Sequence, residues 1–379
     1  MKRDMQGQYI KSSLTGEHYN TYYPNPLPPK DLNYSEFSEM LEKANIAVGE
    51  LNGVIQTYPF PSIIQYSYIR KEAVLSSQIE GTQSTLDDLI KYESDCATGV
   101  PVDDVEEVSA YVRAMNYGLR REKELPLSLR LIREIHSELL NNTRGKTKNP
   151  GEFRVSQNWL GGTRPTNAKF VPVSPDNLLK TLDSFEKYMA DETDKTPMLI
   201  KIALLHHQFE TIHPFLDGNG RIGRLLITLF LVINKFLKSP FLYISVFFRK
   251  HRNLYYEYLD SARFDGDWEK WINFFLEAVY ETSIDAKETL IDIQKIFSND
   301  DEKIKTLKKA AQSSSKVFNE FKKKPILAAK EIVKNTDISK PTVMKSLQHL
   351  INLKIVKSIS EKKWGQIFEY TAYMDRINK

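Results

Sequence analysis

Apolar residues recur every three or four positions through most of the chain after residue 33, which is the spacing of one face of an α-helix. Seven such segments lie in the first 212 residues, at 34–51, 63–81, 84–95, 105–119, 128–140, 176–191 and 197–212. Ser128 and Asp176 stand where helix N-caps are expected, at the start of two of them. The pattern therefore predicts a mainly helical body.

Two stretches depart from this pattern. Residues 1–33 hold many turn formers and few apolar repeats, so we expect an extended, irregular arm. Residues 151–175, GEFRVSQNWLGGTRPTNAKFVPVSP, place strand-forming residues on either side of Gly161 and Gly162 and end in prolines, which predicts a β-hairpin. A long surface loop is the alternative that propensity leaves open.

The last part of the chain predicts a separate module. Residues 268–300 read as one long helix that continues toward Lys309, before the composition changes at SSSK. Two helical patterns, 328–337 and 339–354, then precede alternating residues at 355–373, which is the order of a winged helix-turn-helix. We expect three parts: an N-terminal helical region (1–110), a core (111–295) and a small winged-helix domain (310–379).

Composition limits the class of protein. Hydrophobic residues make up 41% of the 379, which is enough for a folded core, and Cys96 is the single cysteine, so no intramolecular disulfide can form. The N-terminus lacks the apolar core of a signal peptide, and the longest apolar run (225–237) falls short of the roughly 18 residues that a membrane-spanning helix needs. We expect a soluble, cytoplasmic protein with no membrane partner.

Charge is distributed unevenly. Residues 301–379 contain 18 Lys and Arg against 8 Asp and Glu, a net charge of +10, which leaves −6 on the rest of a chain whose total is +4. A basic module on an acidic body suggests a nucleic acid or an acidic protein as partner. A solvated lysine-rich surface is the simpler alternative.

The stretch HPFLDGNGRIGR, residues 213–224, concentrates candidate chemistry. Gly218, Gly220 and Gly223 make the backbone permissive just before an apolar helix, and backbone N–H groups at a helix N-terminus bind anions. Arg221 and Arg224 follow at the start of that helix, from which they can reach phosphate oxygens as paired donors. The segment therefore predicts a phosphate site without the lysine of a P-loop.

Two further side chains of the same stretch add chemistry. Asp217 supplies a carboxylate suited to Mg²⁺ beside the phosphate site, and His213 is the base of the motif that can take a proton from an incoming hydroxyl. Phe215 is interpreted as a hydrophobic anchor. A zinc site built from His213 with His206 and His207 is disfavoured, because the spacing is not His-Glu-x-x-His and no cysteine lies near.

These residues carry a resemblance to a known family. HPFLDGNGRIGR matches the full signature HPFx[D/E]GNGRxxR of the Fic (filamentation induced by cAMP) family. Residues 58–83 resemble the N-terminal Fic region, residues 151–162 resemble the family's flap, and the tail resembles the winged-helix domain of many bacterial members. The resemblance extends from about Tyr34 and implies a Fic-type helical bundle with a β-hairpin flap and a C-terminal winged helix.

The resemblance also implies an activity. Fic enzymes are mostly protein adenylyltransferases, which move AMP from ATP onto a Ser, Thr or Tyr hydroxyl of a target protein. On this chain His213 would deprotonate the target hydroxyl and Asp217 would hold Mg²⁺. Arg221 would contact the phosphates and Arg224 would clamp the γ-phosphate of ATP. The residues that line the anion cradle would be Gly218, Asn219 and Gly220.

A second family signature, [S/T]xxxE[G/N], is matched by Ser76, Glu80 and Gly81 in SSQIEG. Because it lies N-terminal to the main motif, it resembles the inhibitory helix of a class II, self-inhibited member. Glu80 would pair with Arg224 and so take the arginine that the γ-phosphate needs.

The resemblance assigns the remaining parts of the site. The hairpin at 151–175, with its tip region at 159–168, would hold the target peptide by strand pairing. The residues that pack on the nucleotide base would be Tyr255, Tyr256 and Leu259. Arg263 stands where some members have an asparagine near the adenine, which leaves the base preference of this chain open.

The sequence leaves more than one function open. The chain is either a transferase of AMP, a transferase of another nucleotide, or an enzyme that removes AMP with Glu80 as the base that positions water. A different class is a DNA-binding regulator with a nucleotide-sensing core, in which Lys340 and Lys345 would contact phosphates. Self-modification, a second copy of the chain, and a DNA or protein partner for the winged helix are the further partner hypotheses.

Overall fold

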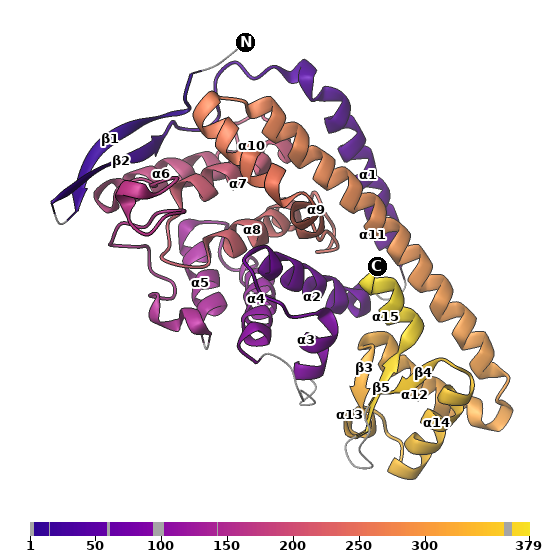
Figure 1. Cartoon of the computed structure of the whole chain (residues 1–379). Coiled ribbons are helices and arrows are strands. Elements are labelled where there is room, and N and C mark those ends of the chain that lie inside the picture. Colours follow the sequence, from indigo (N-terminus) through magenta and orange to yellow (C-terminus); the bar gives the residue numbers. More distant parts are fainter. Residues whose placement is uncertain (1–3, 15, 59–60, 94–101, 142, 360–365) are drawn as a thin grey trace.

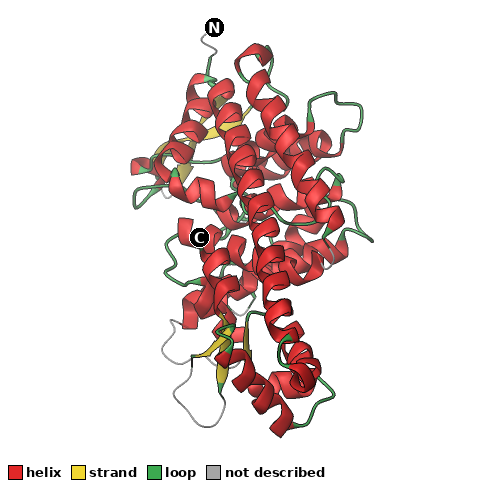
Figure 2. Ribbon diagram, turned by 90° about the vertical axis from the view of Figure 1, so that its right-hand side faces the viewer, coloured by secondary structure: helices red, strands yellow, loops and turns green. Residues whose placement is uncertain are grey.

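The computed structural model describes residues 4–14, 16–58, 61–93, 102–141, 143–359 and 366–379 (Figure 1). The longer helices are α1 (Ser38–Thr57), α2 (Pro61–Ile79), α4 (Val102–Arg121), α5 (Leu129–Leu140), α6 (Pro175–Ala190), α7 (Met198–Ile212), α8 (Asn219–Ile233), α10 (Arg252–Asp265) and α11 (Trp268–Lys305). Shorter helices are α3 (Leu86–Glu93) and α9 (Ser245–Lys250). The predicted mainly helical fold is confirmed (Figure 2). Cys96 and residues 94–95 of one predicted helix lie outside the described residues.

Helix α8 forms the centre of the body. It is apolar on nearly all sides, which is the pattern of a helix surrounded by protein, and nearly all of its residues are buried. Helices α7, α4, α2 and α5 contact it, and α11 packs along α1 on the other side of α7. Trp271 of α11 donates a hydrogen bond to the carbonyl of Ala203 in α7 (2.9 Å), so the long helix is fixed to the layer that carries the site.

The C-terminal module contains α12 (Ala311–Lys323), β3 (Ile326–Ala328), α13 (Ala329–Asn335), α14 (Lys340–Asn352), β4 (Val356–Ser358), β5 (Ile367–Tyr370) and α15 (Thr371–Asn378). Its strands form an antiparallel sheet in the order β3-β5-β4. These elements follow the order expected of a winged helix-turn-helix, and that assignment stays a prediction. Residues 360–365, between β4 and β5, lie outside the described residues.

The C-terminal module packs directly against the helical body (Figure 1). The hydroxyl of Tyr370 donates to Asp300 of α11 (2.7 Å), and the hydroxyls of Tyr373 and Ser67 are 3.0 Å apart in the buried contact between α15 and α2. Helix α11 therefore contributes to the body with its first half and to the module with its second. The predicted division of the chain at 295 and 310 stays a prediction.

The prediction of an irregular arm at residues 1–33 is wrong for residues 7–24. Strands β1 (Gly7–Leu14) and β2 (Glu17–Pro24) form an antiparallel hairpin that turns at Gly16, whose φ of 86° suits glycine. Tyr22 is 1% exposed and lies against the rings of Phe170 and Phe264. The strands carry mostly polar residues and tyrosines, with Ile10 and Leu14 as the aliphatic ones, so their alternation did not stand out as a hydrophobic pattern.

The predicted hairpin at 151–175 is also corrected. The segment is a loop closed by a single β-bridge between Leu160 and Phe170, with a short 3₁₀-helix at Pro165–Asn167 inside it. Its three glycines, Gly151, Gly161 and Gly162, all have positive φ, and its prolines cannot donate to a strand ladder, so pairing does not extend. Instead, the backbone N–H of Tyr22 in β2 donates to the carbonyl of Val171 (2.9 Å). The N-terminal hairpin thus supports this loop from its outer side.

The two predicted N-caps differ in outcome. Ser128 caps α5, where its side chain accepts a hydrogen bond from the backbone N–H of Leu131 (3.3 Å), as predicted. Asp176 is not an N-cap, because α6 begins one residue earlier at Pro175 and Ser174 is the capping residue. Proline suits the first helical position because its missing N–H would be unpaired there. In the described part of the chain, no helix combines the length and apolar character needed to cross a bilayer.

Candidate active site

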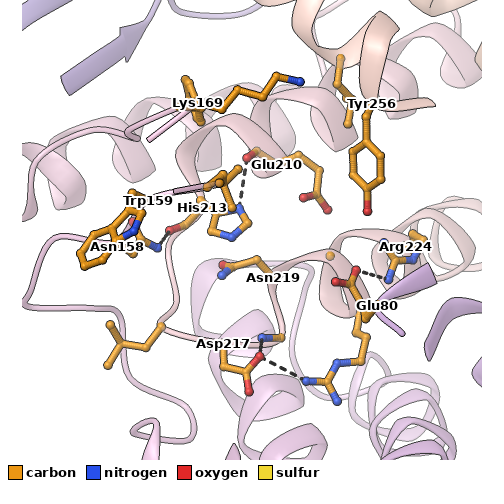
Figure 3. A pocket seen from close by; sticks show the side chains of 18 of the residues that line it. Glu80, Asn158, Trp159, Lys169, Glu210, His213, Asp217, Asn219, Arg224 and Tyr256 are labelled. Carbon is orange, nitrogen blue, oxygen red and sulfur yellow. Dashed lines mark hydrogen bonds and ion pairs between the residues drawn. The ribbon is translucent and has the colours of Figure 1, made fainter. Parts of the chain in front are cut away.

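A cavity of about 820 Å³ opens beside the junction of α7 and α8, bounded by the end of α2, by α10 and by the 151–175 loop (Figure 3). It brings together most of the predicted site residues. Those that line it are Glu80, His213, Asp217, Gly218, Asn219, Gly220, Arg221, Arg224, Tyr255, Tyr256 and Leu259. Of the other two, Ser76 lies buried behind Arg224, and Gly81 directly follows Glu80 with a φ of 107°.

The turn between α7 and α8 is held rigid from within. His213 ends α7 in the left-handed conformation (φ 50°), and Gly218 precedes α8 with a φ of 76°. The Asn219 side chain accepts from the backbone N–H of Phe215 and donates to its carbonyl, both at 2.9 Å. Phe215 is fully buried and stacks on His136, so the predicted anchor role is confirmed. The amide of Asn219 therefore closes the loop, and the free backbone N–H groups at the start of α8 remain for an anion.

Three residues that the motif did not reveal support this turn from outside. His136 donates from Nε2 to the carbonyl of Asp217 (3.0 Å) and accepts at Nδ1 from the N–H of Gly151 (2.9 Å). Arg154 donates from Nε to the carbonyl of His213 (3.0 Å), to which Nδ2 of Asn158 also donates (3.1 Å). Arg154 and Asn158 lie in the 151–175 segment, which departs from the helical pattern of the sequence. His136 has no comparable signal in the sequence.

The side chain of His213 has the geometry of a base. Its Nδ1 faces the carbonyl of Glu210 at 3.3 Å, so in the neutral ring Nδ1 carries the proton and Nε2 is left free to accept one. Burial lowers the pKa of His213 to about 4, and the carbonyl of Glu210 opposes this only in part. The ring is therefore neutral at physiological pH.

Arg224 is fixed at the floor of the cavity. Its guanidinium is 1% exposed, donates to the Ser76 hydroxyl (2.9 Å) and carbonyl (3.0 Å), and pairs with Glu80 at 2.7 Å. Burial by itself would raise the pKa of the Glu80 carboxyl, but the charge of Arg224 outweighs it and the pKa lies below its usual value. A Cβ at Gly220 would lie 2.3 Å from the Glu80 carboxylate, so glycine is needed for Glu80 to rest against α8.

Asp217 has one oxygen available to a cation. Its Oδ1 accepts from the N–H of Gly218 (2.6 Å) and faces Arg221 at 3.4 Å, whereas Oδ2 has no hydrogen-bond partner among the described residues. Its side chain is 41% exposed at the cavity. Since Mg²⁺ takes few protein oxygens beside phosphate and water, this arrangement fits it. The described residues contain no group of three His, Cys, Asp or Glu side chains that would hold a metal unaided.

The other end of the cavity combines aromatic and charged side chains. Tyr255 is buried, with its hydroxyl 2.8 Å from Nε2 of His206, while Tyr256 is partly exposed (37%). Arg263 is buried and pairs with Asp260 (2.7 Å), which Lys169 of the 151–175 loop also contacts at 2.7 Å. His206 and its neighbour His207 are buried core residues.

The helical body places a histidine, the N-terminal end of a helix and two arginines around one cavity, an arrangement suited to binding phosphate. Residues 38–120 match the Fic/DOC family N-terminal model, and residues 126–231 match the Fic/DOC family model. The chain therefore belongs to the Fic/DOC family.

Curated relatives and a solved structure agree with this assignment. The chain is 28% identical over 240 residues to the protein adenylyltransferase Fic of Drosophila yakuba, and 30% identical over 187 residues to that of Aedes aegypti. These matches cover 62% and 48% of this chain but 44% and 34% of the relatives, so the chain spans less than half their length. A Fic family protein from Desulfovibrio desulfuricans shares the fold with a TM-score of 0.57 at 18% identity, over 91% of this chain and 98% of that one.

Proposed function

We propose that the protein is a protein adenylyltransferase, which moves AMP from ATP onto a Ser, Thr or Tyr hydroxyl of a target protein. We further propose that it rests in a self-inhibited state. One observation carries both parts. Arg224 lies in the same cavity as a neutral His213 with a free Nε2, and its guanidinium is held by Glu80 at 2.7 Å.

Each residue then has a step that its geometry supports. The target oxygen bonds to the α-phosphorus as the bond to pyrophosphate breaks, and the hydroxyl proton passes to Nε2 of His213. Backbone N–H groups at the start of α8, with Arg221 and Arg224, hold the triphosphate. Bound Mg²⁺, held through Asp217, would supply neutralisation of phosphate charge.

Self-inhibition follows from competition for one cation. Glu80 and a γ-phosphate cannot both take the free edge of Arg224, since two anions would then share one buried guanidinium. The Glu80 carboxylate also lies against Gly220 at the start of α8, where the phosphates would bind. A nucleotide bound in the presence of Glu80 would therefore be misplaced for in-line attack.

The target protein is proposed to bind along the 151–175 loop. This loop forms one wall of the cavity, and among the described residues its strand pairing is limited to the bridge between Leu160 and Phe170, which supports pairing with an incoming extended segment. Base preference is proposed to depend on Tyr256, Leu259 and Arg263. Because Arg263 is already paired with Asp260, adenine selection by this chain remains the first nucleotide question to test.

The test is intact-mass analysis after incubation with ATP and Mg²⁺, alone and in a cell lysate. Glu80→Gly should add AMP to itself or to lysate proteins, the unsubstituted protein should do so weakly, and Glu80→Gly with His213→Ala should not. The same variants with GTP, CTP and UTP test other nucleotides, and incubation with AMP-labelled protein tests removal. Absence of labelling by Glu80→Gly with every nucleotide would reject transfer.

A further inference from the structure

Glu210 faces the same cavity, and its carboxyl has no role in the mechanism above. Glu210 lies on the last turn of α7, and its carboxyl points into the cavity between His213 and Tyr256 (Figure 3). The residue is 8% exposed. Neither carboxyl oxygen has a hydrogen-bond partner in the part of the chain that the structure describes, and Oε1 is completely buried.

The fold keeps a place for this carboxyl. A Cβ at Gly223 would lie 2.3 Å from Oε1 of Glu210, as a Cβ at Gly220 would lie 2.3 Å from Oε1 of Glu80. One face of α8 therefore has two glycines, one turn apart, and each gives room to a carboxyl group. Arg224 follows them on the same helix, but its hydrogen bonds go to Glu80 and Ser76.

Leaving a buried carboxyl without a partner is costly, so its presence calls for a ligand or a proton. The titratable and charged groups that face it come from four elements: Glu80 after α2, His206 and His213 of α7, Arg224 of α8, and Tyr255, Tyr256 and Arg263 of α10. Burial raises the pKa of Glu210 to about 7, with Glu80 adding to the rise and Arg224 and Arg263 opposing it. In the resting state, the charge of Arg224 thus lowers the pKa of both Glu80 and Glu210.

A bound triphosphate changes this balance. It replaces the single charge of Glu80 with several negative charges near Arg224, and an ionised Glu210 would then face like charge in a buried site. A protonated carboxyl would instead donate a hydrogen bond. We propose that Glu210 is a second nucleotide-contacting residue of the Arg224 site, which admits a nucleoside triphosphate by taking up a proton and donating a hydrogen bond to it. This inference rests on the proposed function, because it assumes that the triphosphate reaches Arg224.

The test measures nucleotide affinity instead of transfer. Glu80→Gly is the parent, because it frees Arg224, and the ligand is the α,β-methylene analogue of ATP with Mg²⁺, which cannot release pyrophosphate. Without Glu80, the pKa of Glu210 lies lower than in the resting state, so a larger share of Glu210 is ionised at neutral pH and must gain a proton on binding. Affinity should therefore fall about tenfold from about pH 6.5 to about pH 8.5, beyond the change due to the nucleotide itself.

Two variants in that parent separate the possible causes. Glu210→Gln keeps a donor without titrating, so its affinity should match the low-pH value of the parent and lose the additional pH dependence. Glu210→Leu has similar size and leaves no buried polar group, so it should fold even if the glutamine variant does not, and bind several-fold more weakly at every pH.

The outcomes distinguish this inference from the proposed function. If Glu80→Gly and its Glu210→Gln derivative share one pH profile, or if Glu210→Leu binds as tightly as the parent at low pH, the role of Glu210 is refuted while nucleotide binding stands. If the parent binds the analogue at no pH, the proposed function fails and this inference fails with it.

Discussion

At the scale of single residues, the site is defined as much by the groups behind His213 as by His213 itself. Its carbonyl accepts hydrogen bonds from Arg154 and Asn158, and its ring is oriented by the carbonyl of Glu210. Arg154 also donates to the carbonyls of Ser156 and Val173, so one buried guanidinium joins the base to both ends of the neighbouring loop. The position of the base is thus set by the loop that we propose holds the target.

The lowered pKa of His213 predicts the pH profile of catalysis. A histidine whose folded pKa lies near 4 stays neutral, and so remains able to accept a proton, at every pH well above that value. Removing Glu80 takes away a negative charge that favours protonation, which lowers the pKa further. We expect the kcat of Glu80→Gly at saturating ATP to be constant from about pH 8 down to about pH 5.5. A fall with a midpoint near 6.5 would show that His213 is more solvated than its surroundings indicate.

At the scale of elements, α2 holds the arginine of the proposed resting state through Ser76, in addition to the contact from Glu80, which follows the helix. Ser76 supplies a hydroxyl and a carbonyl to Arg224, which orient the guanidinium toward Glu80. Its neighbour Ser77 is equally buried, but its hydroxyl has no hydrogen-bond partner in the described residues. Ser77 is therefore a matched control for Ser76: it is a buried serine of the same helix that does not contact Arg224.

Ser76→Ala should therefore release inhibition in part. Losing one hydrogen bond to a charged group costs about 1.5–3 kcal/mol, which corresponds to a rise in AMP transfer of roughly tenfold to 150-fold if the bond mainly stabilises the resting state. Self-labelling rates compared with Glu80→Gly and with Ser77→Ala measure this. Ser77→Ala is expected to match the unsubstituted protein. Equal rates for both serine variants would mean that Glu80 inhibits without the help of Ser76.

The elements also show what the sequence could and could not reveal. Helices with strong apolar periodicity, and the twelve-residue motif around His213, were predictable because local spacing decides both. The pairing of Glu80 with Arg224 joins residues 144 positions apart, and it was available only through family resemblance. The β1–β2 hairpin and the loop at 151–175 were mistaken because partner strands, not local propensity, decide pairing: β2 took the position beside Val171. His136 and Glu210 act through contacts that leave no sequence pattern.

At the scale of the whole molecule, body and module share a helix and therefore a core. Ile293, Phe297 and Ile304 in the second half of α11 are buried, and Arg376 of α15 pairs with Asp292 of the same helix at 3.0 Å. Elements that share buried residues unfold together. We expect calorimetry of the intact chain to show one thermal transition. Two separate transitions, with one of them absent after removal of residues 311–379, would contradict a shared core.

The continuity of α11 limits how far the C-terminal module can move relative to the body. A domain on a flexible linker samples a wide volume, whereas a domain fixed to a continuous helix keeps one distance and one direction. With 38 residues, α11 is about 57 Å long, so anything held by the C-terminal module would lie at a set place relative to the cavity at His213. The surfaces that the proposed transferase could modify would then depend on helix length: inserting one turn would displace the module by about 5.4 Å and change the accessible hydroxyls.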